Sequence, residues 1–340
     1  MSKIERKEES REDRREDRRM QTIENRPLVI LTGPTAVGKT ALSIKLAKKI
    51  QGEIISADSM QVYRYMDIGS AKIRPEEMEG IPHHMLDILD PREEFNVVIF
   101  QEKVKQCIRE IYERGHIPIL TGGTGFYIQA ILYDIDFQEN PDDTGIRQDL
   151  ERLAAEKGSL YLHQQLQAVD PVSAEAIHPN NSKRVIRALE FYHLTGEKIS
   201  EHNEAEKQKS PAYCSCYFVL NDQRERLYQR IDARVDGMIK EGLVEEVERL
   251  KQMGCHQTMV SMQGLGYKEI LRFLEGEISL EEAVYLIKRD TRHFAKRQLT
   301  WFRRERDVSW LSKDAYESES ALLEVMLKQL EKRGIWKETV

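Results

Sequence analysis

The stretch Gly33-Pro34-Thr35-Ala36-Val37-Gly38-Lys39-Thr40 decides the fold, because it fits the phosphate-loop pattern G-x-x-x-x-G-K-[ST] at every fixed position. An apolar run at 28–31 precedes it and predicts a buried strand, while residues 41–47 follow it with the apolar spacing of a helix. A glycine-rich turn between strand and helix points successive backbone N–H groups at one anion, and the helix N-terminus adds partial positive charge. The chain is therefore expected to bind a diphosphate or a polyphosphate such as ATP.

Two side chains of this motif have separate expected roles. Lys39 is expected to neutralise phosphate oxygens, and the Thr40 hydroxyl is expected to ligate Mg²⁺, the cofactor that the motif implies. Residues 33–40 together form the candidate diphosphate-binding or nucleotide-binding site. The motif identifies neither the phosphate ester nor the bond that breaks, and it leaves open whether ATP competes for the site.

The composition limits the class of protein. A chain of 340 residues can form one large α/β domain with a substantial insertion, or two domains. The formal net charge of −6 argues against a basic nucleic-acid coat, so any nucleic acid would be held by a local patch. The four cysteines are too few and too scattered for a disulfide framework, which indicates a reducing compartment. No apolar run approaches the ~20 residues of a membrane span, and the N-terminus lacks the apolar region of a signal peptide. We expect a soluble cytoplasmic protein, and a monomer because no large spare apolar face is evident.

Residues 1–25 consist mostly of Arg, Lys, Glu and Asp. Such a segment cannot offset its ordering entropy by burying apolar surface, so a disordered charged tail is expected. A basic arm for RNA is the alternative, although acidic residues match the basic ones nearly one for one.

Strand and helix patterns alternate through the first part of the catalytic core, which is expected to comprise residues 26–140 and 211–315. The predicted strands are 28–32, 53–57 and 117–121, and the predicted helices are 39–50, 95–114 and 124–132. Such alternation requires right-handed crossovers and a parallel sheet covered by helices on both faces. The expected fold class is α/β, a P-loop NTPase-like parallel sheet flanked by helices.

The rest of the chain is predominantly helical. Residues 141–210 contain helical pieces and no strand pattern, and a β-rich run resumes at 213–220, so an all-helical insertion domain between two sheet strands is expected. Predicted helices follow at 223–240, 243–253, 267–275 and 279–304, then a short apolar run at 308–311 that can form a last strand, and a C-terminal helix within 316–340.

Polar residues follow the predicted strands at the edge where a ligand should bind. Asp58 comes directly after the strand 53–57, and the carboxyl ends of neighbouring parallel strands share one crevice, so Asp58 should face the phosphate loop. A carboxylate there can ligate a metal or act as a general base. The alternative is a helix N-cap formed with Ser59.

The third predicted strand ends in Leu120-Thr121-Gly122-Gly123-Thr124, where an ordinary ATPase would carry an acidic residue. Gly122 and Gly123 are expected to let a ligand approach the backbone closely, and Thr124 to meet a phosphate or a base through its hydroxyl or N–H. This pattern argues for a transferase whose acceptor lies between the strand ends. Arg224, Arg230 and Arg234 follow the strand 213–220, and an arginine there can add a bidentate phosphate contact.

Basic residues gather at 183–187 and along 288–304. In the second segment Arg289, Arg292, Lys296 and Arg303 share one predicted helix face, which is typical of a nucleic-acid track or, more ordinarily, of a solvated helix surface. The loop 261–268 combines glycines with an amide, an aromatic ring and a cation, which suits an unpaired nucleotide, although its Tyr267 can equally be a core residue.

In this order, the motifs resemble the tRNA dimethylallyltransferase (tRNA isopentenyltransferase) family, and the resemblance covers nearly everything from Leu28 to Trp310. Besides the phosphate loop it rests on Ile55-Ser56-Ala57-Asp58-Ser59-Met60-Gln61-Val62-Tyr63, Met66-Asp67-Ile68-Gly69-Ser70-Ala71-Lys72, Pro82-His83-His84, Leu86-Asp87-Ile88, Gly122-Gly123-Thr124, His178-Pro179-Asn180, Arg187-Ala188-Leu189-Glu190, Gly264-Leu265-Gly266-Tyr267 and Ala295-Lys296-Arg297-Gln298-Leu299-Thr300-Trp301. The zinc finger that eukaryotic relatives carry at the C-terminus is not seen in this sequence, so the chain resembles the bacterial form of the family.

The resemblance implies transfer of a dimethylallyl group from dimethylallyl diphosphate to N6 of the adenine 3′ of the anticodon, in tRNAs that read codons starting with U. It implies that Asp58 is the general base and that Thr124 and Arg234 complete the catalytic site. The implied tRNA-binding residues are Asp58, Ser59, Met60, Gln61, Thr124, Arg147, Lys183, Arg184, Val185, Ile186, Arg187, Gln263, Gly264, Leu265, Gly266, Tyr267 and Lys268. The helical insertion is similar to the family's lobe that grips the anticodon stem-loop.

Two other functions fit parts of the pattern. A small-molecule or nucleoside kinase uses the same loop and also places an Asp after the second strand. A non-catalytic, nucleotide-gated RNA-binding module would need the loop and the basic patches but not Asp58.

Overall fold

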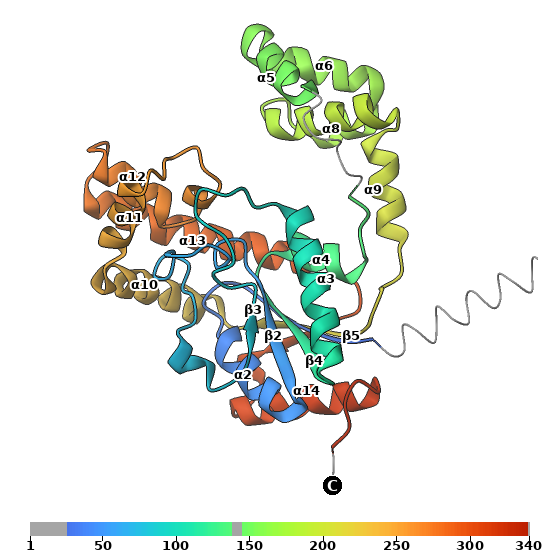
Figure 1. Ribbon diagram of the computed structural model, residues 1–340, viewed down its shortest axis with the longest axis vertical. Helices are drawn as coiled ribbons and strands as arrows, with labels where there is room; N and C mark the ends of the chain where they lie inside the picture. Colours follow the sequence, from blue (N-terminus) through green and yellow to red (C-terminus); the bar gives the residue numbers. More distant parts are fainter. Residues whose placement is uncertain (1–25, 138–144, 339–340) are drawn as a thin grey trace, which may run out of the picture. The chain divides into compact units, whose positions relative to one another are not determined.

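The computed structural model describes residues 26–137 and 145–338, and the charged tail predicted at 1–25 lies outside them. The chain divides into two compact units, one formed by the chain up to Leu132 and from Pro211 onward, the other by Tyr133–Ser210 (Figure 1). We call them the sheet unit and the helical unit. Within the described ranges, no helix combines the length and the apolar character that a membrane span requires.

The sheet unit contains a six-stranded sheet in the order β3-β2-β4-β1-β5-β6, and all five pairings are parallel. The strands are β1 (Pro27–Thr32), β2 (Gly52–Ala57), β3 (His83–His84), β4 (Ile117–Gly122), β5 (Cys214–Asn221) and β6 (Val308–Ser312). The predicted parallel sheet is therefore confirmed, including the last strand. Strand β3 was not predicted, because two residues are too few to show a strand pattern.

The helices of the sheet unit begin and end within a few residues of the predicted positions. They are α2 (Lys39–Ile50), α3 (Val97–Glu113), α4 (Gly125–Leu132), α10 (Arg224–Glu241), α11 (Leu243–Gln252), α12 (Tyr267–Leu274), α13 (Leu280–Phe302) and α14 (Glu319–Lys332), with short 3₁₀ turns η1 (Pro75–Met78), η2 (Ser261–Gln263) and η3 (Lys313–Ala315). Asn96 shows why α3 begins where it does, since its side chain accepts hydrogen bonds from the N–H groups of Val98 and Ile99.

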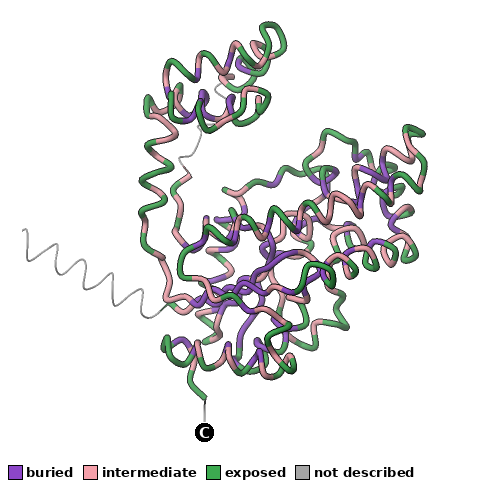
Figure 2. The backbone as a smooth tube through the Cα atoms, turned by 180° about the vertical axis from the view of Figure 1, so that it is seen from behind, coloured by how far each residue is buried: buried purple, intermediate pink, exposed green. Residues whose placement is uncertain are grey.

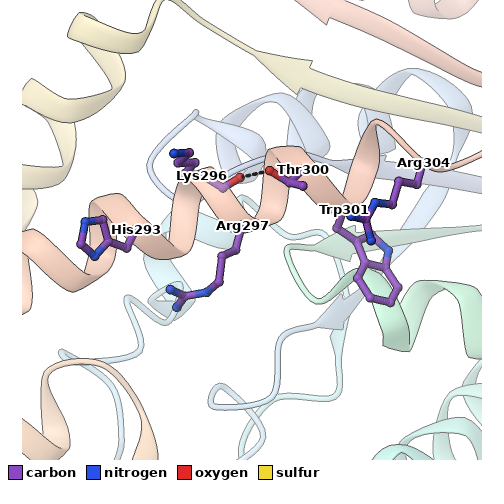
Figure 3. Close-up of a pocket in the computed structure, with 6 residues that line it drawn as sticks. All are labelled: His293, Lys296, Arg297, Thr300, Trp301 and Arg304. Atoms are coloured by element: carbon purple, nitrogen blue, oxygen red, sulfur yellow. Dashed lines mark hydrogen bonds between the residues drawn. The ribbon is translucent and has the colours of Figure 1, made fainter. Parts of the chain in front are cut away.

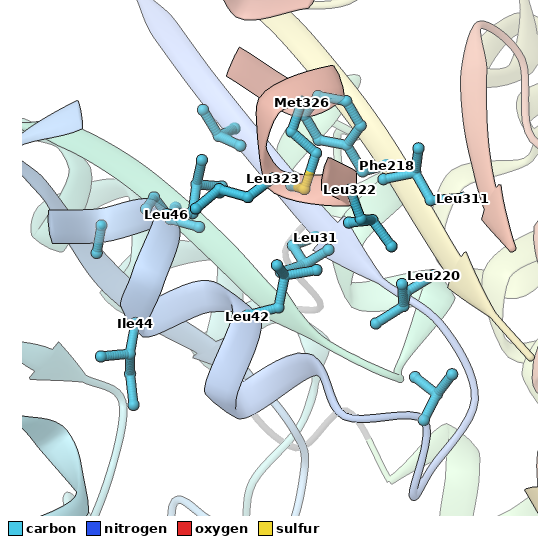
Figure 4. Close-up of a cluster of buried hydrophobic side chains, with 14 of the residues drawn as sticks. Leu31, Leu42, Ile44, Leu46, Phe218, Leu220, Leu311, Leu322, Leu323 and Met326 are labelled. Carbon is cyan, nitrogen blue, oxygen red and sulfur yellow. The ribbon is translucent and has the colours of Figure 1, made fainter. Parts of the chain in front are cut away.

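One part of the core of the sheet unit lies between the strands and the helices α2 and α14, and another contains the buried side chains of α3 and α4. Leu31, Leu42, Phe218 and Met326 belong to the buried cluster of the first part (Figure 4). Burial coincides with the strands and the inner faces of the helices (Figure 2), and β2 is buried along its whole length. Strands that are covered on both faces must be apolar on both, which is why β1 reads as a continuous apolar run rather than an alternating one.

The two cysteines of β5 share one face of the strand, because they are two residues apart. Cys216 is buried, Cys214 is half-buried, and both thiols lie against α14, near the carbonyl oxygens of Gln329 and Arg333. The cysteines among the described residues are free thiols, and this pair belongs to the apolar cluster.

The helical unit has a core of its own. Its helices are α5 (Ile146–Lys157), α6 (Ser159–Val169), α7 (Pro171–Ala176), α8 (Ser182–Thr195) and α9 (Ile199–Gln208). Leu162, Leu166 and Leu189 are almost completely buried between them. Asp170, also buried, accepts hydrogen bonds from the N–H and hydroxyl groups of both Ser173 and Ser200, which ties α7 to the start of α9. In the described part of this unit the regular secondary structure is all helical, as predicted.

Candidate active site

The phosphate loop connects β1 to α2 and is shaped by its glycines. Gly33 has φ 146°, and a Cβ at this position would lie 2.2 Å from the carbonyl oxygen of Leu220 in β5, so no larger residue fits there. Lys39, the first residue of α2, donates hydrogen bonds of 2.9 Å from Nζ to the carbonyl oxygens of Gly33 and Pro34. Its ammonium group therefore lies over the loop, where the motif predicts that phosphate oxygens bind.

Three charged side chains from three elements interact at this loop. Burial and the nearby charge of Arg234 lower the pKa of Lys39 to about 7, and Asp58 opposes the shift. Arg234 comes from α10, and Asp58 follows the last residue of β2. The strand ends thus bring together the side chains that the sequence places far apart, as expected for the carboxyl edge of a parallel sheet.

Asp58 is half-buried, and its Oδ1 accepts a hydrogen bond of 2.9 Å from the N–H of Met60. No helix begins at Ser59, so the alternative that Asp58 is a helix N-cap is wrong. Burial raises the pKa of Asp58, and the N–H groups of Met60 and Gln61 and the charge of Lys39 limit the rise. The carboxylate is held in one orientation by the turn that follows β2.

Arg234 differs from its neighbours in having no carboxylate partner among the described residues. Arg230 pairs with Asp222 at 2.5 Å, and Arg292 of α13 pairs with Asp232 at 2.6 Å. Surrounding protein and the like charge of Arg230 lower the pKa of Arg234, yet the side chain keeps access to solvent. A guanidinium that has no carboxylate partner of this kind and is accessible to solvent can bind an anionic ligand. Arg224, also predicted near the phosphates, instead lies over the ring of Tyr228.

Thr124 lies between β4 and α4 and is half-buried. Its N–H points to the carbonyl oxygen of Ala57, at 3.4 Å, which places Thr124 beside Asp58. The N–H is therefore used within the protein, and of the two groups that we expected to meet a ligand, the hydroxyl is the one that remains.

The glycines before Thr124 do not provide the close approach of a ligand that we expected. A Cβ at Gly122 would lie 2.3 Å from the Ala57 carbonyl oxygen, and one at Gly123 would lie 2.1 Å from Nε2 of Gln298. Protein atoms fill the space, so these glycines serve the packing of β2, β4 and α13. Gln298 received no predicted role from the sequence, although the resemblance includes it, because a glutamine on a basic helix shows nothing of its burial.

The two candidate RNA-binding loops of the sheet unit pack against each other. A Cβ at Gly264 would lie 2.8 Å from Sδ of Met60, so the segment 58–61 touches the segment 263–268. Gln263 is exposed, and Leu265 and Lys268 are half-buried, whereas Gly264, Gly266 and Tyr267 are buried. Gln61 uses its amide within the protein, accepting from the Ser56 hydroxyl at 2.9 Å and donating toward the Ser70 carbonyl oxygen at 3.3 Å.

The prediction that Tyr267 binds a nucleotide with its ring is wrong, because the residue has no exposed surface. Its hydroxyl donates a 2.8 Å hydrogen bond to Glu246, and burial together with that carboxylate raises the pKa of Tyr267 well above its usual range. Glu246 also accepts from the N–H groups of Asp67, Ile68 and Gly69. Tyr267 and Glu246 thus anchor the loop at 67–69, the core alternative that the sequence left open.

The exposed basic surface of α13 is rotated from the face that we predicted. Arg289 and Arg292 are paired with Asp290 and Asp232. A shallow pocket of about 420 Å³ is lined instead by Arg304, which follows α13, and by five residues of the helix itself: His293, Lys296, Arg297, Thr300 and Trp301 (Figure 3). These residues recur at helical spacing and carry three permanent positive charges. An apolar ring beside such charges suits an RNA strand.

In the helical unit the predicted tRNA-binding residues divide by exposure. Lys183 and Arg184 are exposed at the start of α8. The side chains of Val185 and Ile186, also predicted to bind tRNA, belong to the core of the unit, so a contact of these residues with tRNA would have to be made by their backbone. Arg147 and Arg187 both bind the carboxylate of Glu190, Arg147 through two bonds of 3.0 and 2.7 Å.

The residues at the phosphate loop fit a magnesium ion whose coordinating oxygens come mostly from a bound phosphate ligand and from water. Thr40 is exposed in the first turn of α2, where its hydroxyl is accessible. Across the described ranges, no group of three or more His, Cys, Asp or Glu side chains is arranged to hold a metal ion. This donor set matches Mg²⁺, which commonly keeps water and phosphate ligands and takes few from protein.

The chain is similar to known proteins of one family. A family model described as IPP transferase matches residues 61–305. A tRNA dimethylallyltransferase of Lachnoclostridium phytofermentans is 63% identical over 312 residues, which are 92% of this chain and 100% of the relative. A tRNA dimethylallyltransferase of Carboxydothermus hydrogenoformans is 57% identical over 283 residues, 83% of this chain and 91% of the relative.

Solved structures of enzymes that act on tRNA also match most of this chain. The full-length tRNA isopentenylpyrophosphate transferase of Bacillus halodurans is 43% identical, has a TM-score of 0.69, and is matched over 91% of this chain and 98% of its own. A eukaryotic dimethylallyltransferase acting on tRNA is 29% identical with a TM-score of 0.76, over 92% of this chain and 81% of its own. The predicted P-loop NTPase-like α/β class is thereby confirmed, and the chain belongs to the IPP transferase family of tRNA dimethylallyltransferases.

Proposed function

We propose that this protein transfers the dimethylallyl group of dimethylallyl diphosphate to N6 of the adenine 3′ of the anticodon, in tRNAs that read codons starting with U. The products are N6-(dimethylallyl)adenosine and diphosphate. The observation that carries the proposal is the convergence of Lys39, Arg234 and Asp58 at the phosphate loop, in a chain whose relatives are tRNA dimethylallyltransferases. The family gives no support to the kinase alternative.

The cations at the loop stabilise the leaving group in this proposal. Cleavage of the allylic C–O bond develops positive charge on carbon and negative charge on the departing diphosphate. We propose that backbone N–H groups of the loop, Lys39 and Arg234, which has no carboxylate partner among the described residues, stabilise that negative charge as it grows. Such preorganised groups are the usual source of electrostatic catalysis. Mg²⁺, held by Thr40 and phosphate oxygens, would neutralise further charge on the same group.

Asp58 is the proposed general base. The exocyclic amine of adenine becomes acidic only as it bonds to the allylic carbon, so its proton must be accepted late in the reaction. Burial raises the pKa of Asp58, which makes the carboxylate a better proton acceptor than an exposed one. Thr124 lies beside it and is proposed to orient the base or the phosphate through its hydroxyl.

The tRNA is proposed to contact both units separately. In the sheet unit the candidates are the exposed Gln263, the half-buried Lys268 and the basic pocket of α13, and in the helical unit they are the exposed Lys183 and Arg184. The target adenine must leave its stack to reach the strand ends, at a cost of a few kcal/mol. We further propose that the enzyme works in the cytoplasm as a monomer.

The experiment that tests the function compares two labelled donors. The purified protein is incubated with unmodified tRNA, Mg²⁺ and either allyl-labelled dimethylallyl diphosphate or ATP labelled in its terminal phosphate. We expect label from the first donor in the tRNA, with diphosphate released, and none from ATP. Transfer of phosphoryl label to any acceptor would instead establish the kinase alternative.

A further inference from the structure

The inward face of α13 carries one polar side chain that joins two parts of the site. Gln298 is 6% exposed. Its Oε1 accepts a hydrogen bond of 2.8 Å from the N–H of Thr35 in the phosphate loop, and its Nε2 donates one of 3.0 Å to the carbonyl oxygen of Gly123. A backbone N–H only donates and a carbonyl only accepts, so these partners define the orientation of the amide.

The two partners of Gln298 belong to the two strand ends between which the proposed reaction takes place. Thr35 follows β1, and Gly123 follows β4 directly before Thr124. Thr124 in turn lies against Ala57, the residue before Asp58. The contact is tight, because a Cβ at Gly123 would lie 2.1 Å from the Gln298 amide nitrogen. One buried amide therefore links the loop for the leaving group to the segment beside the general base.

We propose that Gln298 is a positioning residue that sets the distance between the phosphate loop and the Thr124 segment. This inference rests on the proposed function and adds a residue to it. A neutral amide is required, since one planar group then carries both an acceptor for the Thr35 N–H and a donor for the Gly123 carbonyl oxygen. An apolar residue would leave both backbone groups unpaired, and an ionised carboxylate would place an oxygen against the Gly123 carbonyl.

The test uses the variant Gln298→Glu across pH. At pH 8 the carboxylate repels the Gly123 carbonyl, and we expect kcat/KM for dimethylallyl diphosphate to fall about 10- to 100-fold. A buried carboxyl that faces a carbonyl has a raised pKa. At pH 6 the protonated form can donate to Gly123 and accept from Thr35, so the ratio of variant to wild-type activity should recover. The variant Gln298→Met lacks both groups and should lose activity at every pH.

Gln101 provides a matched control. It is buried to nearly the same degree, at 8% exposed, and donates a 2.8 Å hydrogen bond to the carbonyl oxygen of Ala130, which joins α3 to α4. We expect Gln101→Glu to lower the melting temperature without changing KM and without recovery of activity at low pH. A ratio for Gln298→Glu that does not change with pH, or an unchanged kcat/KM, would overturn the proposal.

A binding measurement tests the role of Gln298 independently of the proposed reaction. Calorimetry measures the affinity for inorganic diphosphate with Mg²⁺. We expect Gln298→Glu to bind diphosphate more weakly than the wild type at pH 8, with recovery at pH 6. This result does not depend on prenyl transfer. If the wild type binds diphosphate but transfers no dimethylallyl group, the proposed function fails, and the diphosphate affinities still decide the role of Gln298.

Discussion

At the scale of single residues, Lys39 has an unusual property for a lysine. Its pKa of about 7 means that the free side chain is largely neutral above that pH. A bound diphosphate would remove this effect by favouring the charged form, so the pKa in the complex should be higher than in the free protein. Binding should then take up a proton, and the affinity should fall as the pH rises past 7.

We therefore predict that binding of inorganic diphosphate with Mg²⁺ at pH 8 takes up about one proton more in the wild type than in Lys39→Met. The measurement is titration calorimetry in two buffers that differ in their ionisation enthalpy. Equal proton uptake by the two proteins would show that Lys39 stays charged in the free site.

The second residue-scale prediction concerns Asp58. Asn in its place keeps an oxygen that can accept from the Met60 N–H but cannot take a proton, so turnover should fall about 10²- to 10⁴-fold. The affinity for tRNA should change little. The control is Asp307→Asn, at an exposed position with φ 51° that asparagine also tolerates. Wild-type turnover by Asp58→Asn would favour the non-catalytic RNA-binding module.

At the scale of elements, a buried carboxylate explains how a two-residue strand is held at the sheet edge. Glu53 of β2 accepts two hydrogen bonds from Arg114, which follows α3, and lies 2.6 Å from Nε2 of His84 in β3. His116, just before β4, contacts the same carboxylate at 2.7 Å. The hydrogen bonds from Arg114, then those from the histidines, lower the pKa of Glu53 to about 2 against the effect of burial.

This cluster predicts how stability depends on pH. Because the pKa of Glu53 is lower in the folded state, its contribution is present above the unfolded value near 4.5 and is lost as the pH falls toward 2. Glu53→Gln should lower the free energy of unfolding at pH 7 by about 3 kcal/mol, and the difference from wild type should shrink in acid. Denaturant unfolding between pH 3 and pH 7 measures both. Glu79→Gln, in an exposed pair with Lys48, is the control and should have little effect at any pH.

The basic surface of α13 gives the second prediction at this scale. Lys296→Glu with Arg297→Glu should weaken tRNA binding and reduce the slope of log Kd against log salt by about one per lost phosphate contact. Diphosphate affinity should be unchanged, since both side chains are exposed. Lys332→Glu on α14 removes a charge of the same sign and should leave the slope as it was. An unchanged slope in the α13 variant would identify its basic face as an ordinary solvated surface.

At the scale of the whole molecule, two units with separate cores permit their surfaces to be changed independently. Lys183 and Arg184 are exposed on α8, while their neighbours Val185 and Ile186 supply core side chains. Lys183→Glu with Arg184→Glu should therefore weaken tRNA binding without lowering the melting temperature or the affinity for diphosphate. Lys157→Glu, on α5 of the same unit, is the control. Wild-type tRNA affinity in the double variant would remove α8 from the proposed RNA surface.

The sequence by itself determined the phosphate loop, the alternation of strands and helices, the parallel sheet and the helical insertion. These features depend on local patterns, in which backbone freedom and apolar spacing act over a few residues. Residue type and position made Asp58 a candidate, with a helix N-cap as its alternative, and made Arg224, Arg230 and Arg234 candidates together. The resemblance to the family then singled out Arg234 and gave Asp58 the role of general base.

Only the tertiary structure decided which of these side chains meet and which are buried. For Tyr267 and Gln298, neither the residue type nor the local sequence pattern shows whether the side chain contacts a ligand or the protein core. Their roles depend on Glu246, Thr35 and Gly123, and Gln298 is separated by 263 and 175 residues from the last two. The burial of a side chain is a property of what packs against it, so it is settled only when distant elements come together.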